Sequence, residues 1–228
     1  MLNLYLCGQR AFGRAVLEMC LAEKHRVLGV SAPLYYQREQ SAPDRLHLAA
    51  TEAGIPVLPA GVLTADLLPA GVDLILAAHS HDFIGRKTRL RAKIGAIGYH
   101  PSLLPLHRGR DAVRWTIRDR DRVAGGSIYW LSDTVDAGDL AAQDFCLVDP
   151  EDTVESLWRE KLFPMGVSLF REVLDDISRG ILTAVPQEHA SATWEPSWER
   201  PPLRRPDVPM IGPGLQGFTV RRDTSALH

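Results

Sequence analysis

The sequence predicts a doubly wound α/β fold with a mostly parallel sheet, followed by a proline-rich C-terminal tail. Short apolar runs alternate with segments of helical periodicity along residues 2–178, and this order builds a parallel sheet. The run 73–78, DLILAA, is apolar almost throughout, as in strands that are buried on both faces of a sheet. Seven prolines fall between Pro186 and Pro213, which excludes a helix or a central strand there.

The expected strands are short apolar runs bounded by turn residues. They cover residues 2–7, 25–31, 55–58, 73–78, 94–99, 124–131 and 141–148. The first run stops at Gly8, which favours a tight turn into the helical segment that follows.

Four segments have helical periodicity, and their ends carry capping signals. They cover residues 11–23, 42–53, 111–118 and 153–178. Phe12 and Val16 share one face of the first helix, Gly54 follows the second as a C-cap, and Thr153 or Asp152 caps the last. The last helix is the longest, and its expected inward residues are Leu157, Leu162, Val167, Phe170 and Leu174.

Composition excludes several classes of protein. The chain has 228 residues, of which 45% are hydrophobic, so it can bury a core and is not globally disordered. A formal charge of −2 argues against a dedicated nucleic-acid binder. Three scattered cysteines form no disulfide framework and no Cys-x-x-Cys pair. No signal peptide and no 18-residue apolar stretch is found, so no membrane span and a cytoplasmic location are expected.

Two basic or glycine-containing segments match no phosphate-binding motif. The turn at Gly8 and Gly13 is neither Gly-x-Gly-x-x-Gly nor a P-loop, which favours a plain strand–helix turn over an anion site at the helix N-terminus. Residues 86–93 carry five positive charges in eight positions. A solvated helix face is the preferred interpretation, and a phosphate-attracting face is the alternative.

Histidines follow the strand expected at 73–78. His79-Ser80-His81-Asp82 would lie at the carboxyl end of a parallel strand, where open α/β sheets bind ligands. The preferred interpretation is a pocket lining. A metal site is the alternative, in a hydrolase that uses His79, His81 and His100, and it would need further ligands in the right geometry.

A second histidine and a carboxylate form the candidate catalytic pair. His100 leaves the strand expected at 94–99 and enters a turn bounded by Pro101 and Pro105. Asp136 follows 36 residues later in a loop that contains Gly138. A histidine beside a carboxylate can manage proton transfer, although spacing alone favours a structural role over a catalytic one.

These segments resemble a known family. His100-Pro101-Ser102-Leu103-Leu104-Pro105, then Arg108-Gly109-Arg110, then Val135-Asp136-Ala137-Gly138, are similar to motifs of the 10-formyltetrahydrofolate-dependent formyltransferases. This family includes methionyl-tRNA formyltransferase, through its catalytic domain, and the amino-sugar N-formyltransferases. The resemblance covers residues 1–185 and implies a Rossmann-like fold. It divides the chain into a catalytic domain, 1–185, and a proline-rich extension, 186–228.

The resemblance also implies roles for individual residues. His100 and Asp136 match the catalytic histidine and aspartate, and no metal is implied. The folate would lie against the two loops that close the site, formed by His81, Asp82, Phe83 and Ile84 and by Leu131, Ser132 and Asp133. Gly98 departs from the family, which has asparagine two positions before the histidine. Either a water in the space at Gly98, or His79 or His81, is expected to replace that amide.

The function implied is transfer of a formyl group from 10-formyltetrahydrofolate to a primary amine of a small molecule, with an amino sugar nucleotide as the leading acceptor. Two alternatives stay open: a folate-binding member of the family that Gly98 has impaired in catalysis, and an enzyme like methionyl-tRNA formyltransferase. The net charge and the short C-terminal segment disfavour tRNA. The expected partners are therefore the folate and a small amine, without nucleic acid or membrane, and a homodimer is left open.

Overall fold

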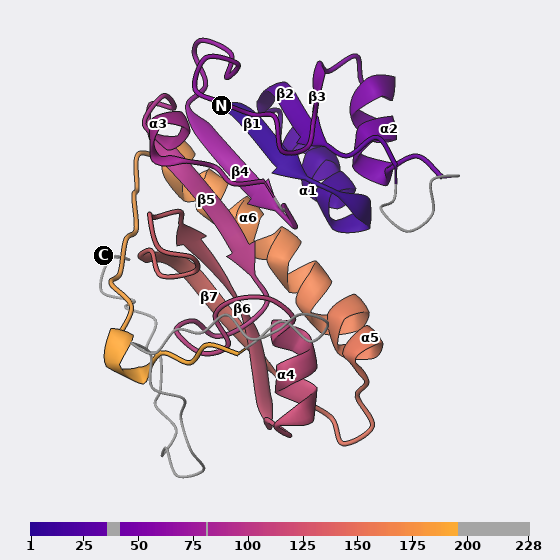
Figure 1. The fold of residues 1–228 in the computed structure, drawn as a ribbon, viewed down its shortest axis with the longest axis vertical. Helices are drawn as coiled ribbons and strands as arrows, with labels where there is room; N and C mark the ends of the chain where they lie inside the picture. Colours follow the sequence, from indigo (N-terminus) through magenta and orange to yellow (C-terminus); the bar gives the residue numbers. More distant parts are fainter. Residues whose placement is uncertain (36–41, 81, 196–228) are drawn as a thin grey trace.

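Seven strands form one sheet at the centre of the structure, a computed structural model that describes residues 1–35, 42–80 and 82–195 (Figure 1). The order is β3-β2-β1-β4-β5-β6-β7. The strands are β1 (Asn3–Gly8), β2 (Arg26–Ala32), β3 (Val57–Pro59), β4 (Leu74–Ala78), β5 (Gly95–His100), β6 (Val123–Trp130) and β7 (Leu140–Leu147). Strands β1 to β5 pair in parallel, whereas β6 and β7 are antiparallel additions at one edge. The predicted fold class is confirmed, and each expected strand is present to within two residues.

Helices cover one face of the sheet more fully than the other. The helical segments are α1 (Arg10–Ala22), α2 (Arg45–Glu52), α3 (Arg86–Arg89), α4 (Ala112–Arg118), α5 (Val154–Ser156), the π-helix η1 (Leu157–Leu162), α6 (Phe163–Ser178) and the 3₁₀ turn η2 (His189–Ser191). Helices α1 and α6 contact each other across one face, and α2 packs beside α1 (Figure 1). Residues 63–72 and 84–92 contribute the apolar cover of the other face. Within the described ranges, no helix is both long and apolar enough to cross a bilayer.

The strands are apolar on both sides because both faces of the sheet are covered. In β1, Leu4 and Leu6 join the core beneath α1 and α6, while Tyr5 and Cys7 join the core on the opposite face. Successive side chains of a strand point to opposite faces, so a strand buried on both faces reads as a continuous apolar run.

The long helix expected at 153–178 is not a single α-helix. Thr153 caps it as predicted, because its hydroxyl accepts a hydrogen bond from the Ser156 amide at 3.1 Å. The π-helix η1 then interrupts the α-helical bonding just before Pro164. Proline has no amide hydrogen, and its ring clashes with the carbonyl four residues earlier, so the backbone widens there.

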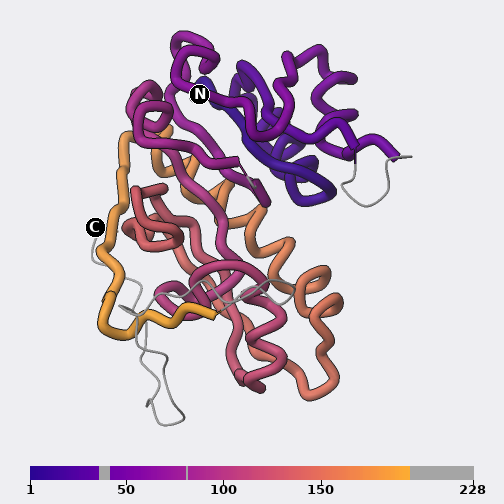
Figure 2. Tube along the Cα trace, in the orientation of Figure 1, coloured from indigo at the N-terminus to yellow at the C-terminus, as the bar shows by residue number. Residues whose placement is uncertain are grey.

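The end of the described chain packs against the sheet and its loops. We call residues 185–195 the C-terminal strap. The strap begins beside the start of β7, at Leu140, and ends beside the loop that follows β5, at Arg108 (Figure 2). Leu140 and Val185 exchange two backbone hydrogen bonds, of 2.8 and 2.9 Å, and the Arg108 amide donates to the Thr193 carbonyl at 3.1 Å. The predicted tail beyond Glu195, with Trp198, lies outside the described residues.

Candidate active site

The structure brings His100 and Asp136 together. His100 is the last residue of β5, and Asp136 lies in the loop between β6 and β7. The Nδ1 atom of His100 is 3.7 Å from the Oδ2 atom of Asp136, and both side chains are buried. The two atoms are too far apart to form a hydrogen bond with each other. A third polar atom, placed to one side of the two, can lie within hydrogen-bond distance of both.

The other ring nitrogen of His100 is committed to the backbone. Nε2 lies 2.6 Å from the His107 carbonyl oxygen, which can only accept a hydrogen bond. Nε2 therefore carries a proton and donates a hydrogen bond to that carbonyl. The atom left for chemistry is Nδ1, on the side that faces Asp136.

Two donors hold the Asp136 carboxylate. The Tyr129 hydroxyl donates to Oδ1 at 2.6 Å, and the Gly109 amide donates to Oδ2 at 2.7 Å. Asp136 has a left-handed backbone, with a φ of 51°, a conformation that aspartate adopts more readily than most residues. Burial raises the pKa of Tyr129 well above its usual value, and the neighbouring Asp136 raises it further, so the hydroxyl keeps its proton.

Sequence reasoning missed Tyr129, because its place on β6 gives no chemical signal. It faces Asp136 only through the pairing of β6 with β5 and the loop that follows. Gly109 had a signal, since it stands in the Arg108-Gly109-Arg110 motif. Its φ of 97° favours glycine, and its amide reaches Asp136 from that turn.

His107 forms a charged cluster behind His100. Its Nε2 atom lies 2.8 Å from Asp121, and its Nδ1 atom lies 3.1 Å from Glu195 of the C-terminal strap. Burial disfavours a charged imidazole, but the two carboxylates outweigh it and raise the pKa of His107 to about 9. Sequence reasoning also missed this histidine, because its carboxylate partners lie 14 and 88 positions away.

The first loop expected to line the folate site divides into structural and exposed residues. His81 lies outside the described residues. The Asp82 carboxylate accepts hydrogen bonds from the Ser31 hydroxyl, at 2.7 Å, and from the Gly61 amide, so it braces the loop. Ile84 is buried in the core on the sheet face opposite α1 and α6, whereas the Phe83 side chain is 85% exposed and free to contact a ligand.

The second loop is tied to the first by one arginine of α3. Arg89 donates to the Ile84 carbonyl at 2.8 Å and forms an ion pair with Asp133. Ser132 closes its own turn by donating to the Thr134 carbonyl at 2.8 Å. The two loops that the resemblance assigned to the folate are therefore neighbours.

The helix face expected at residues 86–93 is wrong in extent, because α3 is a single turn that ends at Arg89. Arg89 is also not solvated, since its side chain is only 11% exposed. A basic run read from composition could not reveal that Asp133 lies 44 positions away in sequence and opposite Arg89 in space.

Leu131 and Tyr129 are the neighbours nearest to the Gly98 position. A Cβ atom at this position would meet the Cδ2 atom of Leu131 at 3.1 Å and the Tyr129 ring at 3.4 Å. A side chain at this position would therefore contact Leu131 first, and the end of the Leu131 side chain would have to shift by a few tenths of an ångström. The ring of His79 lies 6.2 Å from the ring of Trp158, which packs against the core beneath α1 and α6, whereas the Gly98 position faces Ala77 and Leu131.

The structure brings possible metal ligands together at a different place from the one that the sequence suggested. Across the described ranges, the group that brings possible ligand atoms within 4.8 Å of one another is His107, Asp119 and Glu195. His79 and His100 are not part of it. In this group His107 already forms ion pairs with Asp121 and Glu195, as described above.

The turn before α1 already has a resident anion. The Asp44 carboxylate caps α2 through the Leu46 amide at 2.9 Å and accepts the Arg10 amide at 2.8 and 3.1 Å. A carboxylate at a helix N-terminus is stabilised by the helix dipole. The plain strand–helix turn is thus the better interpretation of residues 8–13.

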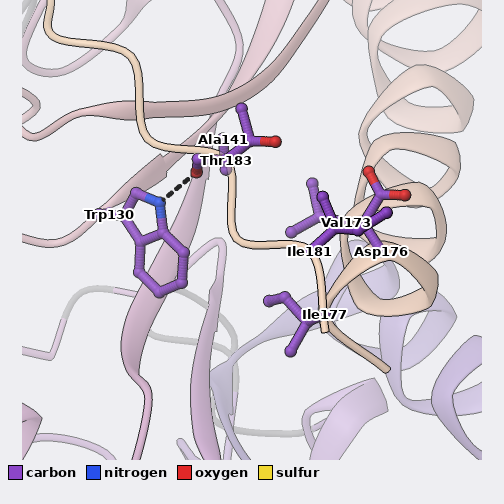
Figure 3. A pocket seen from close by; sticks show the side chains of 7 residues that line it. All are labelled: Trp130, Ala141, Val173, Asp176, Ile177, Ile181 and Thr183. Carbon is purple, nitrogen blue, oxygen red and sulfur yellow. Dashed lines mark hydrogen bonds between the residues drawn. The ribbon is translucent and has the colours of Figure 1, made fainter. Parts of the chain in front are cut away.

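A small pocket lies away from this site. Figure 3 shows it between β6, β7 and the end of α6, where the Trp130 indole donates to the Thr183 carbonyl at 2.8 Å. Its open space is about 180 Å³, below the volume of most small-molecule sites. It includes neither His100 nor Asp136.

Comparisons with known proteins agree on one family. The family model described as formyl transferase matches residues 59–173, just over half of the chain. The mitochondrial 10-formyltetrahydrofolate dehydrogenase of Mus musculus is 35% identical over 219 residues, which cover 88% of this chain and 23% of that protein. The methionyl-tRNA formyltransferase of Lactiplantibacillus plantarum is 30% identical over 212 residues, which cover 86% of this chain and 64% of that protein.

Solved structures agree on the fold. An N-formyltransferase from Helicobacter canadensis, in complex with folinic acid and dTDP-3-aminofucose, superposes with a TM-score of 0.68 at 17% identity, over 85% of this chain and 70% of that chain. The present chain spans about a quarter of the length of the dehydrogenases it matches. The family model rests on residues 59–173, which include His100 and Asp136, and the chain belongs to the formyl transferase family.

Proposed function

We propose that this chain transfers the formyl group of 10-formyltetrahydrofolate to a primary amine of a small molecule. The observation that carries the proposal is the buried pair of His100 and Asp136, with Nδ1 of the histidine 3.7 Å from Oδ2 of the aspartate. Family membership supplies the reaction class, and this pair supplies groups that can move protons during it.

In the proposed reaction, the neutral amine of the acceptor attacks the formyl carbon. A new C–N bond forms, and the formyl oxygen carries negative charge in the tetrahedral intermediate. A proton donated from Nδ1 of His100 stabilises this oxygen. Asp136 accepts the proton lost by the attacking nitrogen. The bond to N10 of the folate then breaks, the oxygen returns its proton to Nδ1 of His100, and N10 takes up the proton held by Asp136, so that the products are a formamide and tetrahydrofolate.

The folate would lie at the two loops joined by Arg89. Asp82, Phe83 and Ile84 form one wall, and Leu131, Ser132 and Asp133 form the other, with His81 as a further expected contact. Phe83 offers an exposed aromatic face on which a pterin ring can stack. The proposal draws support from the names of the related dehydrogenases and from the folinic acid bound to the Helicobacter canadensis enzyme.

An amino sugar nucleotide is the leading acceptor. The Helicobacter canadensis structure holds dTDP-3-aminofucose, an amine of this class. A tRNA acceptor is less well supported, because the chain has a formal charge of −2 and nucleic-acid binding depends strongly on basic surface.

The test is a single-turnover assay with 10-formyltetrahydrofolate and a panel of amino sugar nucleotides and simple amines. Formamide should appear with at least one amine, in step with tetrahydrofolate. A chain that releases neither product with any amine is not the proposed transferase.

One observation favours a second candidate, a folate-binding protein without transfer. Gly98 stands where the resemblance expects an asparagine, and the nearest neighbour of this position is the apolar side chain of Leu131, so a polar contact of the family is missing from this position. Loss of one such contact costs roughly 10²–10³ in rate in other acyl-transfer enzymes. Folate binding in calorimetry together with no transfer would support this candidate instead.

A further inference from the structure

A single buried glutamine joins the two loops of the catalytic pair. Gln187 of the C-terminal strap is 4% exposed. Its amide nitrogen donates to the Asp136 carbonyl at 3.0 Å and to the Gly138 carbonyl at 2.6 Å. Its amide oxygen accepts two hydrogen bonds from Arg108, from Nη2 at 2.6 Å and from Nε at 3.2 Å.

Arg108 links Gln187 to the backbone segment that contacts His100. It stands between His107, whose carbonyl holds Nε2 of His100, and Gly109, whose amide holds the Asp136 carboxylate. The Arg108 side chain is itself buried and also lies 3.0 Å from Nδ1 of His189 in the strap. The position of residues 107–109 therefore depends on what Arg108 binds.

We propose that Gln187 is a positioning residue, which fixes Asp136 at the distance from His100 that formyl transfer requires. This inference rests on the proposed function. Gln187 lies beyond residues 59–173, so the family match does not include it. It touches the backbone of Asp136 and not the carboxylate, and so it acts through the shape of the loop.

The chemistry of the contact suits an amide. The Asp136 and Gly138 carbonyls need a donor, and the Arg108 guanidinium needs an acceptor. The amide nitrogen of glutamine supplies the donor and its amide oxygen supplies the acceptor. Glutamate would keep the Arg108 contact but turn an acceptor toward both carbonyls. Methionine would keep the length of the side chain and lose all four hydrogen bonds, leaving the guanidinium of Arg108 with fewer partners.

The experiment compares Gln187→Glu and Gln187→Met with the wild-type chain. Both variants should lower kcat by roughly 10- to 100-fold, because small displacements of catalytic groups have effects of this size. The KM values for folate and amine should change less than about 3-fold, because the interaction acts on the transition state. Gln187→Glu keeps an acceptor for the Arg108 guanidinium, so it tests the proposal even if Gln187→Met does not fold.

The matched control is Glu188→Gln, an opposite exchange at the next residue. Glu188 is exposed, and its carboxylate accepts the Ala190 amide at 3.1 Å, a contact that glutamine can keep. This control should keep wild-type kcat. An equal loss in Glu188→Gln would assign the effect to the strap as a whole and overturn the role of Gln187.

A double-mutant cycle separates positioning from general stability. In an Asp136→Ala background, Gln187→Glu should lower the residual rate by less than about 2-fold, because the group it positions is gone. Full additivity would overturn the proposal. Active wild type with both Gln187 variants at wild-type kcat would overturn the positioning role alone, whereas inactive wild type would overturn the proposed function and this role with it.

Discussion

The His107 carbonyl accepts a hydrogen bond from Nε2 of His100, and two residues later the Gly109 amide donates a hydrogen bond to Asp136. One short segment thus holds both members of the proposed catalytic pair. The segment is itself fastened to the C-terminal strap, where the His107 amide donates to the Thr193 hydroxyl at 2.7 Å. The geometry of the pair therefore depends on a part of the chain that is distant in sequence.

His100→Ala and Asp136→Ala should each lower the single-turnover rate by roughly 10²–10⁴-fold, the usual contribution of general acid–base groups. Both residues lie where a strand ends or in a loop, so circular dichroism should show an intact fold. A variant with near wild-type turnover would remove that residue from the mechanism. A variant that fails to fold would assign the residue a structural role.

Tyr129→Phe should lower the rate by roughly 10-fold. The substitution removes the hydroxyl that donates to Oδ1 of Asp136 at 2.6 Å, and leaves the buried ring in place. Loss of one buried hydrogen bond to a charged group should also lower the free energy of unfolding by about 1–3 kcal/mol. Steady-state kinetics and urea unfolding measure the two effects, and an unchanged rate would contradict a role for Tyr129 in holding Asp136.

Gly98→Asn should lower the melting temperature, because its Cβ atom would stand 3.1 Å from Leu131 and overpacking costs roughly 1–3 kcal/mol. Shortening Leu131 should relieve this cost, so the double variant with Leu131→Ala should melt above the value expected from additive effects. Thermal unfolding of the two single variants and the double variant gives the comparison.

The same variants test catalysis at Gly98. If an amide at this position aids transfer, the double variant should exceed Leu131→Ala in single-turnover rate. Equal rates would mean that the present site does not need the amide.

Phe83→Ser should weaken binding of a stable folate analogue, 5-formyltetrahydrofolate, by roughly 5- to 10-fold, the value of about 1 kcal/mol expected for one aromatic contact. The side chain is 85% exposed, so the melting temperature should stay the same. Isothermal calorimetry measures the affinity. Unchanged affinity would place the pterin ring elsewhere.

Stability should fall as the pH rises through the titration of His107. Its pKa is raised in the folded chain to about 9, above the value of about 6.5 expected when unfolded. Below pH 6.5 both states are protonated, and the ion pairs contribute fully. Between about pH 6.5 and 9 the folded chain binds more protons than the unfolded chain, so up to about 3 kcal/mol is lost progressively.

Urea unfolding at pH 6, 7.5 and 9 measures this loss. His107→Gln is the comparison, because it removes the titrating group and should flatten the dependence over this range. Equal slopes in the two proteins would contradict the assignment to His107.

The sequence predicted the positions of the strands well, because the pattern that marks each strand is local. In the run at 73–78, the residues from Leu74 onward are apolar at both odd and even positions, which is typical of a strand covered on both faces. The π-helix η1 was not predicted, because helical periodicity is nearly the same across an α-helix and a π-turn, and only the effect of Pro164 on its neighbours separates them.

The sequence by itself determined the sheet, the family resemblance and the pair of His100 and Asp136, because short motifs and local periodicity carry these. Only the tertiary structure decided what holds that pair. Tyr129, His107 and Gln187 contact the pair or its loops, and Arg89 joins the two expected folate loops. All four depend on partners brought close by strand pairing, by loops or by the return of the C-terminal strap. Hydrogen bonds and ion pairs depend on distances of a few ångströms, and the spacing of residues along a chain does not fix such distances between separate loops.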